Sequence, residues 1–463
     1  MRLNYFNFKE FNKGFLLTND FGNYAFVSKK DFKKILQRDI DLKTELGIQL
    51  LEKNFVYEDT NIEFSERLKD DIRRQKGYEM LGTSLHIFVV TTACNMRCVY
   101  CQANNGVTDS SVYMTESISE KAVDIALQSP AHFLSFEFQG GEPLLNFPII
   151  MHIVEYAEQH KGCHEIEYNL VSNLTLITEE MLDYFVKYNF NISTSLDGPE
   201  ILHNSNRPFG NGSGSYKKLI DSIQKIRERG LHVGAIQTTT KLSLNYAKEI
   251  VQEYSRLGFD ALFLRPLTPL GKATLNWDKI GYAPEDFVLF YSKALAEIIK
   301  INQEGIFFKE QHASIFLSKI YGKFVNYMEL RSPCGACVGQ LAYYADGNIF
   351  TCDEGRMLYE MGDHTFKLGN VFENSYADII RGGVCKTVCA SSILETIPAC
   401  CDCVYQPYCG TCPVINYAKN HDIIEKEPRG FRCKIYSGML DYLFGQIING
   451  NKDIDAIFKS WCN

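Results

Sequence analysis

The chain has 463 residues, which is too long for one ordinary domain, so two or three domains are expected. Hydrophobic residues make up 45% and charged residues 22%, values typical of globular proteins with a large core. The formal net charge of −8 argues against a nucleic-acid binder held by phosphate contacts, and it leaves room for a basic peptide partner.

The first residues, Met1 to Tyr5, lack the apolar core of a signal peptide, and no segment is long and apolar enough for a membrane span. We therefore expect a cytoplasmic protein. In that compartment its sixteen cysteines are better explained as metal ligands than as disulfides. Three lie at 94–101 and eleven between 334 and 433. Cys163 and Cys462 stand apart and are expected to be ordinary thiols.

Residues 1–80 are predicted to form a small α+β domain. Two strands, at Gly14–Asn19 and Tyr24–Ser28, flank a turn at Asp20–Asn23. Ser28 is expected to cap a helix through Leu36, and a second helix is expected at about Thr44–Lys53. Phe55–Tyr57 could close a small sheet.

Strands and helices then alternate from Leu81 to about Thr268. The predicted strands are Leu85–Val90, Phe133–Phe138, Ile166–Val171, Ile192–Leu196, Val233–Thr238 and Ala261–Arg265. The predicted helices are Glu116–Gln128, Phe147–His160, Glu179–Tyr188, Tyr216–Arg229 and Asn245–Leu257. Short apolar strands alternating with amphipathic helices indicate a parallel sheet covered by helices. Six such units are too few for a closed eight-stranded barrel. Residues 271–330 are predicted to be a helical bridge, with helices at Pro284–Lys300 and Ala313–Lys323.

Three cysteines, Cys94, Cys98 and Cys101, follow the first of these strands with the spacing C-x3-C-x2-C. Three thiolates on a tight loop can hold three irons of a [4Fe–4S] cluster and leave the fourth iron open to a small molecule. The alternatives are a zinc loop or three unrelated thiols. Zinc usually takes four ligands from two paired spacings, and Tyr100, directly before the last cysteine, is not part of that pattern. The cluster interpretation is therefore favoured.

Polar and glycine residues follow the later strands of the sheet. Gly140 and Gly141 would let the backbone approach a ligand closely, and the Glu142 carboxylate could accept hydrogen bonds from an ammonium group. Further polar or glycine residues at strand ends are Ser172, Asn173, Ser193, Ser195, Asp197, Gly198, Gln237, Thr238 and Thr239. For any one of them, capping a strand or helix is the competing explanation. Their repetition at successive strand ends favours a binding site.

The three-cysteine loop with Tyr100 resembles that of the radical S-adenosylmethionine (SAM) superfamily. The resemblance implies an α/β fold with a partial (β/α)6 TIM barrel, and an open iron that binds the amino and carboxylate groups of SAM. It implies cleavage of SAM to a 5′-deoxyadenosyl radical, with a flavodoxin or ferredoxin as electron donor. The cofactor-binding residues that it implies are Tyr100, Gly140, Gly141, Glu142, Asn173, Ser195, Asp197, Arg207 and Gln237.

In the same way, residues 1–80 resemble the winged-helix leader-peptide recognition domains of peptide-modifying enzymes, and a cap that only packs on the main domain is the alternative.

Residues 331–463 hold the second group of cysteines, including two C-x2-C pairs that would also suit a zinc ribbon. Eight of them would fill two four-thiolate sites. The pattern resembles the SPASM extension, which holds two auxiliary [4Fe–4S] clusters and so implies three clusters in all. By position the first auxiliary cluster would use Cys334, Cys337, Cys352 and Cys412, and the second Cys400, Cys403, Cys409 and Cys433.

Two features of this region depart from the family pattern. Cys334 and Cys337 are closer together than the opening pair of sulfatase-maturing members, which leaves open whether both are ligands. Cys385, Cys389 and Cys401 are additional, and they could replace a ligand, serve the substrate or simply pack. Asp353 follows Cys352, at the place where related peptide-oxidising members carry a base; the alternative is a loop carboxylate facing water.

The chain thus resembles radical SAM/SPASM peptide maturases over nearly its whole length, and most of all the B-type maturases of the His-Xaa-Ser repeat peptide system. The stretches that carry this likeness are Phe15–Asn19, Leu85–Thr91, Phe263–Leu267 and Cys403–Gly410. The expected function is hydrogen abstraction from a residue of a ribosomally made precursor peptide, giving an oxidised or cross-linked product. The alternatives are a formylglycine-generating sulfatase-maturing enzyme and a non-enzymatic iron–sulfur electron-transfer or scaffold protein.

Overall fold

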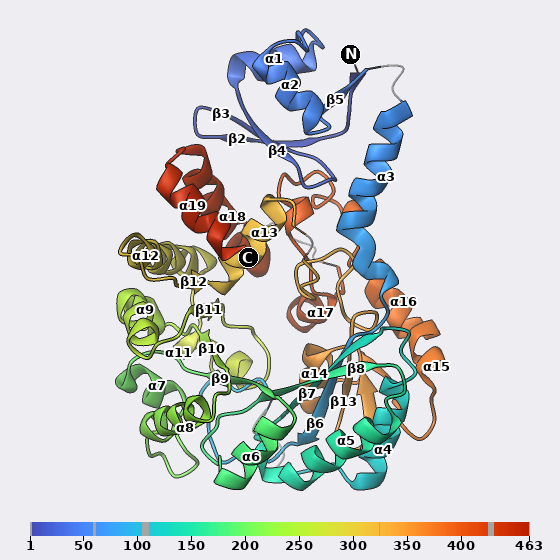
Figure 1. Ribbon diagram of the computed structural model, residues 1–463, viewed down its shortest axis with the longest axis vertical. Coiled ribbons are helices and arrows are strands. Elements are labelled where there is room, and N and C mark those ends of the chain that lie inside the picture. Colours follow the sequence, from blue (N-terminus) through green and yellow to red (C-terminus); the bar gives the residue numbers. More distant parts are fainter. Residues whose placement is uncertain (1, 59–61, 104–110, 324, 425–429, 463) are drawn as a thin grey trace.

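A ten-stranded sheet forms the centre of the molecule, in the order β12-β11-β10-β9-β8-β7-β6-β13-β14-β15 (Figure 1). The computed structural model describes residues 2–58, 62–103, 111–323, 325–424 and 430–462. Six neighbouring parallel strands of this sheet are β6 (Leu85–Thr91), β7 (Phe133–Gly140), β8 (Glu165–Val171), β9 (Asn191–Ser195), β10 (Val233–Thr238) and β11 (Ala261–Arg265). They are the six predicted strands, and the expected α/β partial barrel is confirmed.

Helices cover the outer face of these strands. They are α4 (Glu116–Ala126), α5 (Phe147–His160), α6 (Glu179–Lys187), α7 (Glu200–Asn206), α8 (Tyr216–Glu228) and α9 (Ala247–Arg256). Thr115 and Thr178 cap α4 and α6 by accepting hydrogen bonds from backbone N–H groups of the first turn. All but α7 lie where the sequence predicts a helix, because each has an apolar stripe that packs against the alternate buried side chains of the strands.

The N-terminal residues form a separate layer, seen at the top of Figure 1. Its elements are β1 (Arg2–Leu3), β2 (Asn7–Phe11), β3 (Gly14–Thr18), β4 (Tyr24–Ser28), α1 (Lys29–Leu36), α2 (Glu45–Glu52) and β5 (Val56–Tyr57), followed by α3 (Ile62–Lys76). The predicted hairpin and both predicted helices are present, and Ser28 caps α1. The strand β5 pairs only with β1, apart from the three-stranded sheet β2-β3-β4.

Residues 271–330 are mainly helical, as predicted. Their elements are α10 (Lys272–Leu275), α11 (Trp277–Ile280), α12 (Pro284–Gln303), β12 (Lys309–Glu310) and α13 (Gln311–Ile320). The short strand β12 was not predicted, and it extends the central sheet by pairing parallel to β11.

The C-terminal region joins the same sheet rather than forming a detached body. Its elements are β13 (Gln340–Tyr343), β14 (Asn348–Phe350), α14 (Asp353–Glu360), β15 (Lys367–Asn370), α15 (Tyr376–Arg381), α16 (Gly383–Ala390), α17 (Pro413–Asn420), α18 (Phe431–Ile448) and α19 (Lys452–Trp461). The strand β13 pairs parallel to β6, and β14 returns antiparallel to β13 across a turn at residues 344–347. Short 3₁₀ turns lie at Gly77–Met80, Pro143–Asn146, Ser243–Asn245, Leu394–Thr396 and Gln406–Tyr408.

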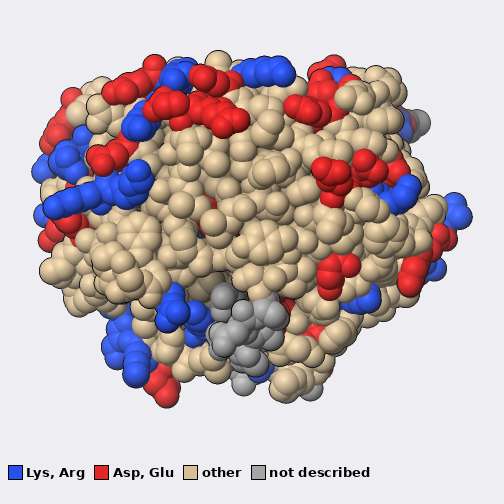
Figure 2. Space-filling model, turned by 90° about the horizontal axis from the view of Figure 1, so that it is seen from below, with Lys and Arg blue, Asp and Glu red and all other residues tan. Residues whose placement is uncertain are grey.

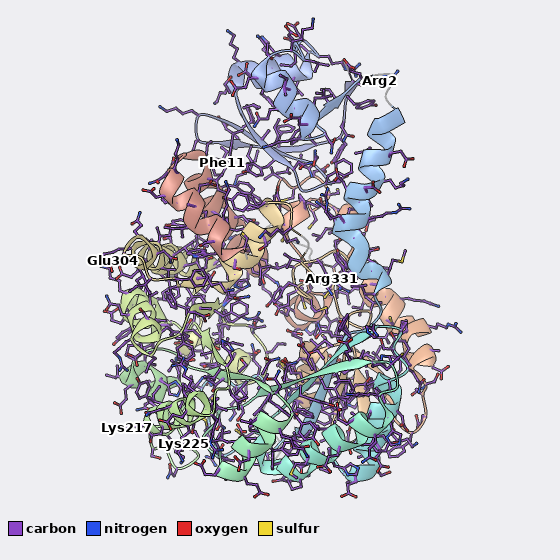
Figure 3. All side chains as sticks on the ribbon, viewed as in Figure 1. Arg2, Phe11, Lys217, Lys225, Glu304 and Arg331 are labelled. Atoms are coloured by element: carbon purple, nitrogen blue, oxygen red, sulfur yellow. The ribbon has the colours of Figure 1, made fainter. Side chains whose placement is uncertain are left out.

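The N-terminal sheet is bonded to the C-terminal cysteine loop. Thr18 Oγ1 donates to the Val404 carbonyl at 2.7 Å, and Asn7 Nδ2 donates to the Cys401 and Cys403 carbonyls at 3.0 and 3.1 Å. Phe11, labelled in Figure 3, is buried in the main core. These contacts hold the N-terminal sheet against the C-terminal loop at residues 401–404.

On the face shown in Figure 2, the charged side chains do not form a single patch. On the face in Figure 2, Lys, Arg, Asp and Glu lie mostly near the rim, and the middle is largely uncharged. Among the described helices, none is both long and apolar enough to cross a membrane.

Candidate functional site

The loop that carries Cys94, Cys98 and Cys101 leaves the end of β6 and lies against the glycine turn that follows β7. Gly141 N donates to the Thr91 carbonyl at 2.9 Å, and Glu142 N donates to the Ala93 carbonyl at 2.7 Å. A Cβ atom on Gly141 would lie 2.3 Å from the Ala93 oxygen, and one on Gly140 would lie 2.1 Å from the Thr91 oxygen. Both glycines are therefore needed for the close backbone approach that holds the cysteine loop.

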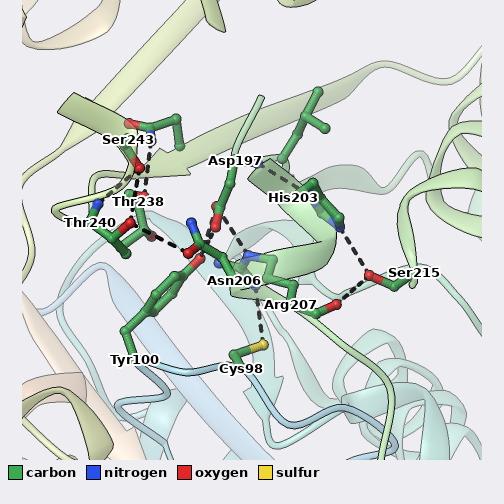
Figure 4. A network of polar contacts seen from close by, with 12 residues as sticks. Cys98, Tyr100, Asp197, His203, Asn206, Arg207, Ser215, Thr238, Thr240 and Ser243 are labelled. Atoms are coloured by element: carbon green, nitrogen blue, oxygen red, sulfur yellow. Dashed lines mark hydrogen bonds and ion pairs between the residues drawn. The ribbon is translucent and has the colours of Figure 1, made fainter. Parts of the chain in front are cut away.

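A buried polar network ties this loop to the end of β9 (Figure 4). The Tyr100 hydroxyl contacts both Asp197 carboxylate oxygens, at 2.8 and 2.7 Å, and Arg207 Nε donates to Asp197 Oδ1 at 3.1 Å. Arg207 Nη1 also reaches Cys98 Sγ at 3.8 Å. Burial raises the pKa of Cys98 to about 11 and the Arg207 charge opposes that rise. The network therefore places a fixed positive charge beside a thiol whose thiolate needs one.

His203 and Ser215 complete this network, and neither was predicted from the sequence. His203 Nδ1 accepts a hydrogen bond from the Asp197 N–H at 3.3 Å, and its Nε2 lies 3.1 Å from Ser215 Oγ. Ser215 Oγ donates to the Arg207 carbonyl. Burial lowers the pKa of His203 to about 4, so the ring is neutral near pH 7 and serves to hold the backbone around Asp197 and Arg207.

Glu142 and Asn173 brace the loop from the neighbouring strand ends. The fully buried Glu142 carboxylate accepts hydrogen bonds from Ser172 Oγ at 2.6 Å, Asn173 N at 2.8 Å and Leu144 N at 3.1 Å. Burial raises its pKa to about 7. Asn173 Nδ2 donates to Asn95 Oδ1 at 2.8 Å, which fixes a residue between two of the cysteines.

The concave face of the sheet is polar at β7. In β7 the side chains alternate, with Leu134, Phe136 and Phe138 buried against the helices and Glu137 half-buried on the opposite face. Burial raises the pKa of Glu137 to about 7, and Asp353 adds to that rise from the first turn of α14. Glu137 was missed from the sequence, although the alternation Phe136-Glu137-Phe138-Gln139 points it away from the apolar layer.

The predicted base Asp353 is held beside the cysteine loop by a buried arginine. Arg356 Nη2 and Nε donate to Asp353 Oδ1 at 2.6 and 2.9 Å. The Arg356 charge also lowers the pKa of Cys101 against the larger effect of burial. Asp353 is thus a paired carboxylate, and its role as a base stays a prediction.

Two further residues of the predicted SAM site differ in their surroundings. Ser195 is half-buried at the end of β9. Gln237 is fully buried, and its amide is occupied by the Thr238 carbonyl and the Thr239 hydroxyl, at 2.9 and 2.8 Å.

The predicted auxiliary ligands Cys334, Cys337, Cys352 and Cys412 share one buried cluster, and Cys409 lies close to Cys400, Cys403 and Cys433. Their role as ligands stays a prediction. In the first group, burial raises the pKa of Cys352 well above its ordinary value, and Cys412 and Cys334 raise it further. In the second group, burial raises the pKa of Cys409 to about 12, and the neighbouring thiols of Cys433, Cys403 and Cys400 add to the rise. Such buried thiols are neutral unless a metal compensates the thiolate charge. Within the described ranges, no three His, Cys, Asp or Glu side chains converge on a position for a single metal ion.

Three arginines beside predicted ligand cysteines have buried N–H groups that no described atom accepts. They are Arg331 Nε and Nη2, Arg356 Nη1 and Arg432 Nε. Each arginine is electrostatically coupled to a predicted ligand: Cys334 for Arg331, Cys101 for Arg356 and Cys412 for Arg432. Arg331 lies toward the middle of the molecule in Figure 3. A buried unsatisfied donor costs about 1–3 kcal/mol, and an anionic iron–sulfur cluster would accept such hydrogen bonds. The residues present therefore fit the clusters that the sequence predicts.

A charge triad that the sequence did not predict lies between β11 and the auxiliary thiols. Glu329 Oε1 accepts from Arg265 Nη2 at 2.7 Å, and Glu329 Oε2 accepts from Arg432 Nη2 at 3.1 Å. Although burial opposes ionisation of Glu329, the two arginines lower its pKa to about 2. The triad thus keeps Arg432 fixed beside Cys412.

Comparison with known proteins gives a consistent result. Residues 88–261 match the family model of the radical SAM superfamily. The cysteine-type anaerobic sulfatase-maturating enzyme of Clostridium novyi (strain NT) is 24% identical over 339 residues, covering 71% of this chain and 87% of that protein. The radical SAM cyclopropyl synthase TigE of Paramaledivibacter caminithermalis is 23% identical over 262 residues, covering 53% of this chain and 52% of that protein.

Two solved structures share the fold over most of their length. Native anSMEcpe with bound AdoMet has a TM-score of 0.67 at 21% identity, covering 79% of this chain and 98% of that chain. Streptococcus suis SuiB bound to the precursor peptide SuiA has a TM-score of 0.57 at 16% identity, covering 92% and 98%.

Residues 88–261, which include the loop at Cys94–Cys101, thus match the radical SAM superfamily. The chain is similar in sequence to anaerobic sulfatase-maturating enzymes, and it shares its fold with anSMEcpe and SuiB.

Proposed function

We propose that this protein is a radical SAM/SPASM enzyme that modifies a ribosomally made precursor peptide. A [4Fe–4S] cluster held by Cys94, Cys98 and Cys101, together with SAM, would supply a 5′-deoxyadenosyl radical that abstracts hydrogen from the peptide. The observation that carries the proposal is the close packing of the Gly140–Gly141 turn on the three-cysteine loop, beside a polar concave sheet face.

The roles of the chain's own residues follow from their contacts. Arg207 and Asp197 orient Tyr100 and hold a positive charge at Cys98. We propose that Gly140, Gly141, Glu142, Asn173, Ser195 and Gln237 shape the SAM site with them. Asp353 would take a proton from the substrate, with Arg356 orienting its carboxylate.

We propose that Cys334, Cys337, Cys352 and Cys412 hold one auxiliary cluster and that Cys400, Cys403, Cys409 and Cys433 hold another. With the SAM cluster this gives about twelve irons per chain. These clusters would accept the remaining electron, and a flavodoxin or ferredoxin would reduce the SAM cluster in the cytoplasm.

The likeness to the His-Xaa-Ser system favours a short peptide with His-Xaa-Ser repeats as the substrate. Residues 1–80 would bind its leader segment. Hydrogen exchange of the whole protein with and without a leader peptide tests this. Protection within residues 2–58 supports the proposal, and protection confined to the barrel contradicts it.

A second candidate function is formylglycine formation in a sulfatase, because the sulfatase-maturating relative aligns over 71% of this chain. The two candidates predict different substrates. Mass spectrometry after anaerobic incubation with SAM and dithionite would show a change of mass in either the repeat peptide or a sulfatase-derived peptide. Formylglycine formation from cysteine exchanges sulfur for oxygen as well as removing hydrogen, which distinguishes it from hydrogen loss alone.

The enzymatic proposal itself is tested by 5′-deoxyadenosine formation. Wild-type protein should release it from SAM, and Cys101→Ala should not. If reduced wild-type protein releases none with either peptide, the protein is an iron–sulfur scaffold or electron carrier instead.

A further inference from the structure

Five buried cysteines share one small apolar cluster, although a [4Fe–4S] cluster needs only four. They are Cys334, Cys337, Cys352, Cys385 and Cys412. The fifth, Cys385, belongs to none of the ligand sets carried over from the family pattern. Its side chain is 2% exposed, so it lies as deep as the proposed ligands.

Cys385 lies on α16, next to Cys337. The Cys385 thiol lies close to the thiols of both Cys337 and Cys389, and it interacts electrostatically with each of them. Cys385 and Cys389 are four residues apart and therefore lie on the same face of α16. The three thiols thus form a row that runs from the first auxiliary group outward.

Cys337 is the least typical member of the first auxiliary group. It follows Cys334 by only three residues, and its φ of +66° is uncommon for a residue other than glycine. Its N–H donates to the Thr351 carbonyl at 2.7 Å, which fixes its backbone between Cys352 and α16. The Cys337 side chain is buried in the same cluster as the other proposed ligands and Cys385.

We infer that Cys385 is an alternative fourth ligand of the first auxiliary cluster and exchanges with Cys337 on a core of Cys334, Cys352 and Cys412. The inference rests on the proposed auxiliary cluster. In the exchange, one iron–sulfur bond to Cys337 would break and one to Cys385 would form. The Cys385 thiol would lose a proton and the released Cys337 thiolate would gain one, so no oxidant or reductant is needed.

The test is iron and sulfide content, with electron paramagnetic resonance (EPR) spectra of the reduced protein, for Cys337→Ala, Cys385→Ala and the double variant. Alanine is used because serine oxygen can bind iron. Each single variant should keep the wild-type iron content, with an altered spectrum in at least one of them. The double variant should lose about four irons or yield a three-iron cluster.

Cys389→Ala is the matched control, one helical turn further along α16, and should leave iron content unchanged. Thermal unfolding measured by circular dichroism checks that every variant folds. Two results overturn the inference: Cys337→Ala or Cys385→Ala alone losing as much iron as the double variant, or the double variant keeping all its iron.

Failure of the underlying proposal looks different. If wild-type protein holds only about four irons and Cys352→Ala loses none, there is no first auxiliary cluster to be exchanged. If Cys352→Ala loses about four irons while the Cys337 and Cys385 results contradict exchange, the cluster stands and only the exchange fails.

Discussion

Arg207 joins two parts of the site: its Nη1 lies 3.8 Å from Cys98 Sγ, and its Nε lies 3.1 Å from Asp197 Oδ1. The Asp197 side chain is fully buried and that of Arg207 is 12% exposed. The pair therefore connects the cysteine loop to the end of β9 inside the protein, where an unpaired charge would be costly.

Arg207→Gln should destabilise the fold by about 3–5 kcal/mol, because it leaves the Asp197 carboxylate buried without its cation. Chemical denaturation measures the loss. The matched control is Arg229→Gln, which breaks the exposed, solvent-screened pairs with Glu179 and Asp183 and should cost far less stability. Equal losses in the two variants would contradict a structural role for the Arg207–Asp197 pair. In the double variant Arg207→Gln/Asp197→Asn, part of the stability should return.

Gly141→Ala should abolish SAM cleavage while the protein still folds. The new Cβ would lie 2.3 and 2.5 Å from the Ala93 and Thr92 carbonyl oxygens, so the cysteine loop must shift. The measurement is 5′-deoxyadenosine release together with the change in EPR spectrum when SAM is added. Gly445→Ala is the control, because a Cβ there meets nothing within 4 Å. Normal SAM cleavage by Gly141→Ala would remove the close approach as a functional requirement.

Glu310 should make stability fall as pH rises. Burial raises its pKa to about 7, so the native state holds the proton that the unfolded state loses near pH 4.5. Between pH 5 and 8 this costs the folded state about 3 kcal/mol. Glu310→Gln cannot ionise, so its stability relative to wild type should rise by about that amount across this range, as measured by denaturation at several pH values.

The control for this pH dependence is Glu179→Gln. Arg229 and Lys225 lower the pKa of the exposed Glu179, so its stabilising effect is complete above its unfolded pKa and is lost only on acidification. The stability difference between Glu179→Gln and wild type should stay constant from pH 5 to 8. A Glu310→Gln difference that is equally constant would show that Glu310 is ionised in the folded protein throughout.

Thr18→Val should weaken the second auxiliary site from a distance. The change removes the hydrogen bond from Thr18 Oγ1 to the Val404 carbonyl and leaves that carbonyl unsatisfied, at a cost of about 1–3 kcal/mol. Iron should be lost to a chelator faster than from wild type. Asn4→Ala breaks a contact to Asn54 within the N-terminal domain and should not change this rate. If both variants lose iron at the wild-type rate, the N-terminal sheet does not support the C-terminal loop at residues 401–404.

Local patterns allowed much of the fold to be predicted. The six apolar strands ended within two residues of their predicted bounds, because a buried strand between turn residues has a clear local pattern. The pairing of β13 with β6 had no such signal, since the two strands are about 250 residues apart and both are simply apolar. The strand β2 and the helix α3 were missed because Lys and Glu interrupt the apolar run of β2 and charged residues dominate α3.

The candidate site was predictable in its thiols and less so in what surrounds them. The cysteine spacing predicted which thiols gather in the C-terminal region, apart from Cys385, and their role as ligands stays a prediction. Arg331, Arg356 and Arg432 were not predicted, because a buried arginine looks in sequence like any surface arginine. His203 and Ser215 were missed for a related reason: they act on Asp197 and Arg207 through contacts that only the folded turn after β9 creates.

The parallel pairing of β13 with β6 has a consequence for the order in which the protein is assembled. While the chain leaves the ribosome, β6 keeps one open edge until residues 340–343 arrive, with Gln340 opposite Leu85 and Tyr343 opposite Phe88. The segment that closes this edge lies between Cys337 and Cys352. The edge of β6, the strand that leads into the Cys94–Cys101 loop, is therefore covered by the same segment that lies between Cys337 and Cys352. A product truncated before this segment would expose an unpaired strand.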